Sequence, residues 1–487
     1  MTFPISRHIG AVLSRQRLVV LLIVGTVLVY VNAFQGAFQF DDATILSDPR
    51  LGNSSTFVSH LDGMIRPALK LSFLLDRRLW GDTPAGYHLL NLLLHLGSGL
   101  SLYGIVQRLA REDPVRCRMT PATTVPFWTA LLFLLHPIGT ETVTYVSGRA
   151  TGLMAFFYLA GIYLYLRSTG PRSAPSIPWT YFAAIGCFLL SLLSKEIAVT
   201  FPLALLLIEA VGRGRNWPDL RRVVLRLQLP FWGVLVAFLA MAASYPRYRY
   251  LLDASIGVRP VYENLLTQVN VIAYALSLFF LPGRLSFEHD IPVAAFLFAW
   301  PTPLALLLLL GLLALAVSLA RRSPLAAFGL FWFFLQLLPT NSVLPRYDLL
   351  SDRNLYLAAP GFLLALVAAW SAVLTALAGS PANRGARVGV YGLRILPFTL
   401  VPLLVVTTFA RNAVYATPIA FWSDATRKAP AKARPHLNLG HAYYVAGDFD
   451  RAIAEARKAL ALDRNNPVAQ ANLLAAWRRK AATTDAR

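Results

Sequence analysis

Runs of apolar residues dominate the chain from Leu18 to about residue 410, and polar or arginine-rich segments separate them. Each run is about 15–25 residues long, the length that an α-helix needs to cross the hydrocarbon core of a bilayer. A helix also satisfies every backbone amide within its own segment. The pattern predicts an all-α polytopic membrane protein with about eleven transmembrane helices, at 18–36, 88–107, 124–137, 150–167, 178–194, 197–212, 228–244, 293–320, 324–339, 354–378 and 391–410.

Composition agrees with this pattern, and the charges set an orientation. Of the 487 residues, 56% are hydrophobic and 14% are charged, and the formal net charge is +21. The arginines gather in short segments between apolar runs, which is typical of cytoplasmic flanks and argues against nucleic acid as a partner. The N-terminus is therefore expected in the cytoplasm and the polar segment 37–87, the first loop, outside. Many Arg and Ala residues with little Lys favour a bacterial inner membrane.

One apolar segment, 262–281, is interrupted by Glu263, Asn264, Gln268 and Asn270. If it crossed the membrane, Arg321-Arg322 would fall outside and break the charge rule. We therefore expect this segment to be re-entrant or to lie at the outer interface, with the C-terminal tail outside.

The tail differs from the rest because it reads as soluble, Ala-rich helix from about Trp422. Residues 433–466 follow the tetratricopeptide pattern, and Pro467 begins a second, partial repeat. The sequence thus predicts a transmembrane domain over 1–421 and a repeat tail over 422–487. Free-standing arrays normally need at least three repeats, so this tail is expected to pack on its own membrane domain or on another chain.

Asp41 and Asp42 form an acidic pair where the first apolar run meets water. A charge at a membrane boundary is costly unless it is paired or solvated in a cavity. The predicted topology brings other ionisable groups to the same outer side, so an outward-opening site with acids and cations is expected there. The candidate site residues of this group are Asp41, Asp42, Arg66, His136, Glu141, Arg149, Lys195, Glu196, Asp352 and Arg353.

Plain structural roles compete with this interpretation. The acidic pair could be a solvated loop that ends a helix, and His136 could cap exposed carbonyls. Glu141 and Arg149 could form a structural ion pair, Lys195-Glu196 could be a hairpin tip, and Asp352-Arg353 could neutralise each other. No His, Cys or carboxylate spacing demands a metal, although paired carboxylates leave a divalent metal open.

Several motifs together resemble those of a known family. They are Phe40-Asp41-Asp42, Arg66-Pro67 with Leu79-Trp80-Gly81, the run Gly86–His95, His136-Pro137 with Glu141 and Ser147-Gly148-Arg149-Ala150, Ser194-Lys195-Glu196 and Asp352-Arg353-Asn354-Leu355-Tyr356. The chain resembles the transmembrane and tetratricopeptide repeat-containing O-mannosyltransferases over nearly its whole length. It departs from them in the tail, where that family usually carries many repeats and this chain has about one and a half.

The resemblance implies a GT-C-type glycosyltransferase that uses a lipid-phosphate-linked sugar, mannose on a polyprenyl or dolichyl phosphate. An acceptor hydroxyl needs a carboxylate base, and inversion needs one such base. We assign this role to Asp41, with Asp42 positioning the acceptor or a cation. Arg353, Arg149 and Lys195 are then the candidates for the lipid phosphate, with His136 and Glu141 in support and Arg66, Glu196 and Asp352 in the same substrate-binding set.

The implied partners are a lipid-linked sugar donor, membrane lipids and a protein acceptor that the tail recruits. Two other classes stay open from the residues alone. A lipid-linked sugar transporter or flippase would favour internally repeated halves, and no such repeat is evident. A non-enzymatic scaffold that presents the repeats would not require acids and cations on one face.

Overall fold

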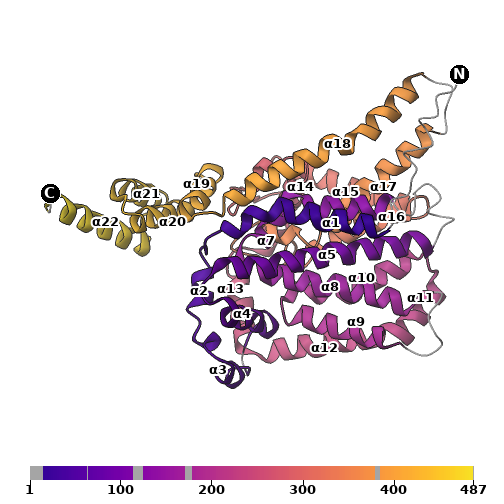
Figure 1. Ribbon diagram of the computed structural model, residues 1–487, viewed down its shortest axis with the longest axis horizontal. Coiled ribbons are helices and arrows are strands. Elements are labelled where there is room, and N and C mark those ends of the chain that lie inside the picture. The colour runs from indigo at the N-terminus through magenta and orange to yellow at the C-terminus, as the bar shows by residue number, and fades with distance from the viewer. Residues whose placement is uncertain (1–14, 63, 113–123, 171–177, 379–383, 486–487) are drawn as a thin grey trace.

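A computed structural model describes residues 15–62, 64–112, 124–170, 178–378 and 384–485. These residues fold into helices and connecting segments, and no strand occurs among them. The helices form two parts, a bundle of long apolar helices and a smaller helical tail that extends from one end of it (Figure 1). The all-α prediction is therefore confirmed for the described residues.

The bundle is built from apolar helices that differ in length. Seven helical segments of the described residues are long and apolar enough to cross a membrane, and three shorter apolar helices accompany them. The predicted count of about eleven spans stays a prediction. The principal helices are α1 (Arg15–Tyr30), α5 (Pro84–Glu112), α6 (Thr124–Leu135), α8 (Arg149–Ser168), α9 (Trp179–Leu192), α10 (Phe201–Leu207), α12 (Leu229–Ser244), α15 (Thr302–Leu319), α16 (Pro324–Leu337), α17 (Ala359–Ala378) and α18 (Arg384–Ala413).

Small residues let some of these helices approach closely. Gly329 of α16 faces Gly361 of α17, and a Cβ built on Gly361 would lie 2.5 Å from the carbonyl oxygen of Gly329. Any larger residue at this crossing would push the two helices apart. Such contacts between small residues are how helices associate in lipid, where burial of apolar side chains gives little net gain.

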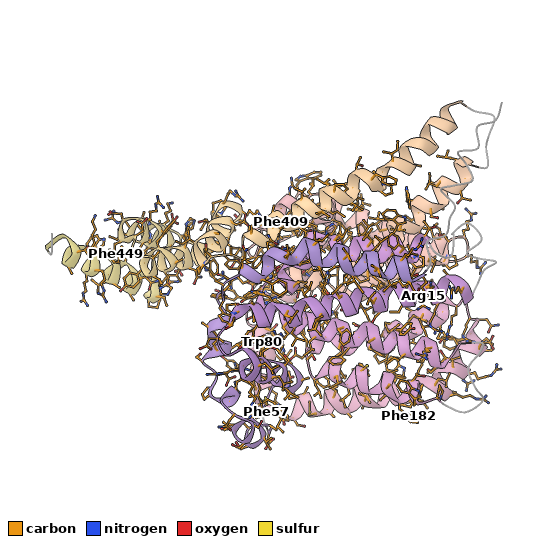
Figure 2. All side chains as sticks on the ribbon, viewed as in Figure 1. Arg15, Phe57, Trp80, Phe182, Phe409 and Phe449 are labelled. Atoms are coloured by element: carbon orange, nitrogen blue, oxygen red, sulfur yellow. The ribbon has the colours of Figure 1, made fainter. Side chains whose placement is uncertain are left out.

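The two ends of the bundle carry different elements. The short helices α2 (Asp42–Leu46), α3 (Ser54–Ser59), α4 (Pro67–Trp80) and α13 (Pro246–Ile256) lie at the end from which the tail extends, here called the tail end (Figure 1). Helix α11 (Trp217–Val223) lies at the opposite end, here called the far end. Figure 2 shows Arg15 and Phe182 toward the far end and Phe57 and Trp80 at the tail end. The first loop is therefore gathered at the tail end.

Helix α14 (Val261–Leu278) binds neighbouring segments near both of its ends, and whether it is re-entrant or interfacial stays a prediction. Near its start, Asn264 donates to the carbonyl of Ser342 (2.7 Å), and just past its end Phe279 accepts from the ring of His136 (3.1 Å). Asn341 donates to Gln268 at 2.8 Å, and Asn270 donates to the hydroxyl of Thr302 at 2.9 Å. The polar residues that interrupt the apolar pattern thus bind neighbouring segments of the protein.

The tail consists of α19 (Pro418–Lys428), α20 (Ala433–Val445), α21 (Phe449–Leu462) and α22 (Pro467–Asp485). The turn between α20 and α21 contains Gly447 with a φ of +81°, a conformation that favours glycine. The predicted domain boundary between residues 421 and 422 falls inside α19. This helix buries Phe421 and Trp422 in a cluster with Tyr145, Phe287 and Tyr415, so the tail packs on the membrane domain.

Candidate active site

A cavity of about 780 Å³ opens at the tail end of the bundle. Its walls come from the first loop, the start of α8, the 3₁₀ turn Glu196–Thr200, α13 and the segment before residue 353. Seven basic side chains and two acidic ones, Asp41 and Glu196, line it. The basic residues are Arg50, Arg66, Lys70, Lys195, Arg247, Arg346 and Arg353. This excess of cations makes the cavity suited to an anion.

The two carboxylates of the acidic pair have different surroundings. Asp42 is 1% exposed, and its side chain accepts hydrogen bonds from the backbone N–H of Gln39 (2.8 Å) and from the N–H and hydroxyl of Ser147 (2.8 and 2.5 Å). Asp41 is exposed on the cavity wall, and its backbone N–H donates to the hydroxyl of Tyr145 at 3.1 Å. Asp42 therefore anchors the loop to the start of α8, whereas Asp41 faces the cavity.

Burial changes the titration of Asp42. Loss of solvent raises its pKa from the ordinary value of 3.8 to about 6, with the charge of Asp41 adding to this rise and the three hydrogen bonds opposing it. Burial of the charged form of Asp42 is therefore unfavourable. The protein's own N–H and hydroxyl groups occupy the acceptor sites of this carboxylate.

Three of the cavity cations, Lys195, Arg247 and Arg346, have no close carboxylate partner among the described residues. The Lys195 ammonium, in a residue that is 6% exposed, donates to the hydroxyl of Thr151 at 2.7 Å. Among the described residues, no carboxylate lies within 4.0 Å of the charged groups of Lys195 or Arg346. Burial, followed by the charges of Arg353, Arg66 and Arg346, lowers the pKa of Lys195 well below its usual range. Bringing an anion into the cavity would relieve this repulsion.

Arg353 lies in the cavity wall, where the buried carboxylate of Glu141 contacts it. Glu141 accepts from the backbone N–H of Arg353 (3.0 Å) and from the hydroxyl of Ser351 (3.0 Å), and its carboxylate lies 3.4 Å from the Arg353 Nε. The guanidinium also lies over the ring of Tyr145, 5.9 Å from its centroid. Burial raises the pKa of Glu141, although the Arg353 charge opposes the rise. Glu141 thus positions Arg353 without reaching the cavity.

A second ion pair joins three wall elements. Arg66 donates from Nη2 to Glu196 at 2.7 Å and from Nε to both carboxylate oxygens, at 3.0 and 3.1 Å. The hydroxyl of Tyr248 on α13 also donates to Glu196, at 3.2 Å. Arg66 has a φ of +58°, which is uncommon for a residue with a side chain. This network ties the start of α4, the Lys195-Glu196 turn and α13 together.

Three predicted site residues lie behind the cavity wall. Arg149 is fully buried, pairs with Asp76 at 2.5 Å and donates to Asn91 at 2.8 Å. His136 accepts from the N–H of Ile138 at 3.1 Å, as a residue that caps a helical turn does. Asp352 accepts from His289 at 2.8 Å. The structure therefore brings Asp41, Arg66, Lys195, Glu196 and Arg353 together at the cavity, and Arg149, His136, Glu141, Asp352 and Asp42 around it.

Four lining cations were not among the predicted site residues, namely Arg50, Lys70, Arg247 and Arg346. Arg50 and Lys70 bind Asp48 at 2.8 and 2.5 Å. All three residues belong to the first loop, as Asp41 does. That proximity in sequence was a usable signal. Arg247 and Arg346 lie about 200 and 300 residues from Asp41 in the sequence, and only the tertiary fold brings them to the cavity.

No metal ligands are assigned. Within the part of the chain that the structure describes, no group of three or more His, Cys, Asp or Glu side chains is arranged to hold a metal ion.

The repeat and the resemblance predicted from the sequence are supported by comparison with known proteins. Residues 433–466 match the family model described as tetratricopeptide repeat. The chain is 21% identical over 443 residues to Protein O-mannosyl-transferase F38B6.6 of Caenorhabditis elegans, covering 87% of this chain and 59% of that protein. It is 25% identical over 489 residues to Protein O-mannosyl-transferase TMTC3 of Homo sapiens, covering 89% of this chain and 50% of that protein.

A shorter match is closer in sequence. Protein O-mannosyl-transferase Tmtc3 of Drosophila melanogaster is 31% identical over 205 residues, covering 36% of this chain and 22% of that protein. The chain thus spans between about a fifth and three fifths of the length of these curated relatives. The predicted resemblance to the transmembrane and tetratricopeptide repeat-containing O-mannosyltransferases is confirmed. Together with the apolar helices, it identifies an integral membrane protein that carries a tetratricopeptide repeat.

Proposed function

We propose that this chain, a relative of protein O-mannosyltransferases over most of its length, is itself a membrane mannosyltransferase. It moves mannose from a polyprenyl-phosphate carrier to a hydroxyl of a protein acceptor. The observation that carries the proposal is the composition of the cavity wall, where the solvent-exposed carboxylate of Asp41 faces an excess of cations. A base for a hydroxyl and a site for a phosphate are the two groups that this reaction needs.

The donor phosphate binds to the cations that lack close carboxylate partners. Lys195 and Arg346 fit this role, and Arg353 joins them because its nearest acid, Glu141, is held behind it at 3.4 Å. Their charges stabilise the phosphate as the bond from the anomeric carbon to the phosphate oxygen breaks. The leaving group is the polyprenyl phosphate, which keeps both electrons of that bond.

Asp41 serves as the general base. Its carboxylate takes the proton of the acceptor hydroxyl while the hydroxyl oxygen bonds to the anomeric carbon on the face opposite the departing phosphate, so the transfer inverts configuration. Asp42 is the poorer candidate because Gln39 and Ser147 occupy its acceptor sites. It contributes by fixing the turn that carries Asp41. No step requires a metal ligand, and divalent-metal dependence is tested by adding a chelator to the assay.

The location of the cavity fits a lipid donor and a protein acceptor. It lies at the end of the apolar bundle, where a carrier embedded in the bilayer reaches it sideways, and the tail extends from the same end (Figure 1). We assign this end to the non-cytoplasmic face, by the charge rule, and the membrane to a bacterial inner membrane. The tail would recruit the acceptor, as repeat surfaces commonly do.

The test is transfer by purified protein in proteoliposomes, with polyprenyl-phosphate mannose and a synthetic peptide rich in Ser and Thr. Removing a general base costs about 10²–10⁴-fold in rate, so Asp41→Asn should lose at least that factor. Asp82→Asn is the matched control, because Asp82 is an exposed carboxylate of the same loop that does not line the cavity. Wild-type transfer by Asp41→Asn would disprove the base assignment, and no transfer by the wild-type protein would disprove the function.

A further inference from the structure

The turn that carries Asp41 has an unusual backbone. Phe40, directly before Asp41, has a φ of +36°, although it is not a glycine. A residue with a large side chain adopts such a conformation only when its surroundings hold it there. Whatever holds Phe40 therefore also fixes the position of the neighbouring carboxylate.

The tail supplies much of what holds it. The Phe40 ring meets the Trp422 ring edge to face, with centroids 5.3 Å apart and planes at 84°. On another side it meets Phe287, at 5.9 Å and 76°. Phe287 and Trp422 also touch each other, at 5.7 Å. Edge-to-face packing of this kind is favourable and directional, so the two rings hold Phe40 from two sides, although the residue stays 39% exposed.

The residues on either side of Phe40 are held by the same aromatic cluster. The side chain of Gln39 donates to the carbonyl of Tyr415 at 3.0 Å, just before α19 begins. The N–H of Asp41 donates to the hydroxyl of Tyr145, whose ring lies 5.6 Å from Phe287. Three consecutive residues of the turn are thus anchored to the junction between membrane domain and tail.

Helix α19 is itself fixed to the bundle by bonds that do not involve the turn. Asp424 pairs with Arg411 of α18, and Lys428 donates to the carbonyl of Leu285 at 2.6 Å. Trp422, at 3% exposed, therefore sits on a rigid support. A residue that positions a catalytic carboxylate must itself be held in place.

We infer that Trp422 of the first tail helix is a positioning residue of the active site, which holds the Phe40-Asp41 turn so that the carboxylate faces the cavity. The tail then has a part in the chemistry itself, in addition to any recruitment of the acceptor. The inference rests on the proposed role of Asp41, but the contact it depends on can be tested without activity.

The first experiment measures backbone hydrogen exchange in the full-length protein in detergent. Trp422→Ala should raise exchange in residues 39–46, and Trp422→Phe, which keeps an aromatic ring, should restore most of the protection. Trp179→Ala is the control, because Trp179 is an exposed residue at the start of α9 and distant in sequence from the cluster. Unchanged exchange in 39–46 would overturn the inference. Loss of protection spread equally over α5 and α8 would also overturn it, since Trp422 would then serve general stability.

The second experiment measures transfer of mannose from polyprenyl-phosphate mannose. A misplacement of about 1 Å can cost about 10²-fold in rate, so Trp422→Ala should lower kcat by about 10- to 100-fold. The donor KM should stay within about twofold, because the cavity cations are untouched. Phe40→Ala should have a similar effect, and the double variant should lose little more than either single one.

The outcomes of the two experiments separate the two proposals. Wild-type kcat in Trp422→Ala, or additive losses in the double variant, would overturn the positioning role. A wild-type protein that transfers nothing would reject the proposed function, and hydrogen exchange would still decide whether Trp422 holds the turn.

Discussion

Basic residues gather at both ends of the bundle, but the two ends differ in whether carboxylates pair with them. At the far end, the buried carboxylate of Glu209 accepts from Arg213 at 2.7 Å, from Arg215 at 2.6 Å and from the hydroxyl of Tyr165 at 2.9 Å. At the tail end, Lys195 and Arg346 line the cavity, and among the described residues no carboxylate lies within 4.0 Å of their charged groups. Removing one partner from a complete buried network destabilises a fold, whereas cations without counter-ions are able to take up the charge of an anionic ligand.

The comparison predicts opposite effects of removing charge at the two ends. At the far end the loss should appear in stability. Glu209→Gln leaves two arginines facing a neutral amide in a buried site, and breaking a buried pair costs about 3–5 kcal/mol. We expect a lower thermal unfolding midpoint in detergent, with transfer per folded molecule unchanged.

Arg222→Gln is the control for that measurement, because Arg222 forms an exposed pair with Asp219 in the same region. An exposed pair contributes about 0–1 kcal/mol, so the midpoint should barely move. If Glu209→Gln abolished transfer in fully folded protein, the far end would have a catalytic role and the contrast would fail.

At the tail end the loss should appear in activity. Lys195→Met removes a buried cation that has no carboxylate partner, so no unpaired acid is left behind. Loss of one donor to a developing charge costs about 10²–10³-fold in rate, and we expect transfer to fall by about that factor. The thermal midpoint should stay the same or rise, since burial of the ammonium opposes folding.

Arg215→Gln is the matched cation removal at the far end. It should lower the midpoint and leave transfer intact, which is the reverse of the Lys195→Met result. A variant of Lys195 that is destabilised but fully active would show that this cation is structural.

A smaller effect should distinguish the two aspartates of the acidic pair. The pKa of Asp42 is about 6 in the folded protein, above its ordinary value of 3.8, because burial disfavours its charged form. The folded state therefore binds this proton more tightly than the unfolded state. The contribution of Asp42 to the free energy of unfolding should fall as the pH rises from 4 to 6 and stay level above that.

The measurement is the difference in unfolding free energy between the wild-type protein and Asp42→Asn, followed from pH 4 to pH 7. The change across this interval should be at most about 3 kcal/mol. Asp82→Asn, which removes an exposed carboxylate of the same loop, should give a smaller slope. A difference between wild type and Asp42→Asn that does not vary with pH would contradict the burial effect.

Features that depend on local pattern were predictable from the sequence. Apolar runs gave the helices of the bundle, and the spacing in 433–466 gave the tetratricopeptide repeat that the family model matches. Lys195 and Arg353 could be selected because a charge at a membrane boundary is costly, whatever surrounds it. The number of transmembrane spans, predicted to be about eleven, is harder to predict. Short helices such as α10 do not show by their length whether they cross the membrane.

Features that depend on distant contacts were not predictable. Asp41 and Asp42 are adjacent, and contacts with Tyr145 and Ser147, more than a hundred residues later, help to give them different surroundings. Arg149 looked like a phosphate ligand, but Asp76 and Asn91 bind it inside the protein. No period or spacing in a single sequence reports such pairings, because each depends on how the helices pack.

The amides of α14 have a consequence for how this protein inserts into a membrane. During insertion, each crossing inverts the side on which the following segment emerges. Asn264, Gln268 and Asn270 interrupt the apolar pattern of α14, which is not among the seven helical segments that are long and apolar enough to span. If α14 does not cross, as the charge rule predicts, Phe40 and Trp422 emerge on the same side, as their contact requires. Replacing the three amides by leucine is then expected to favour a crossing there and to separate Trp422 from Phe40.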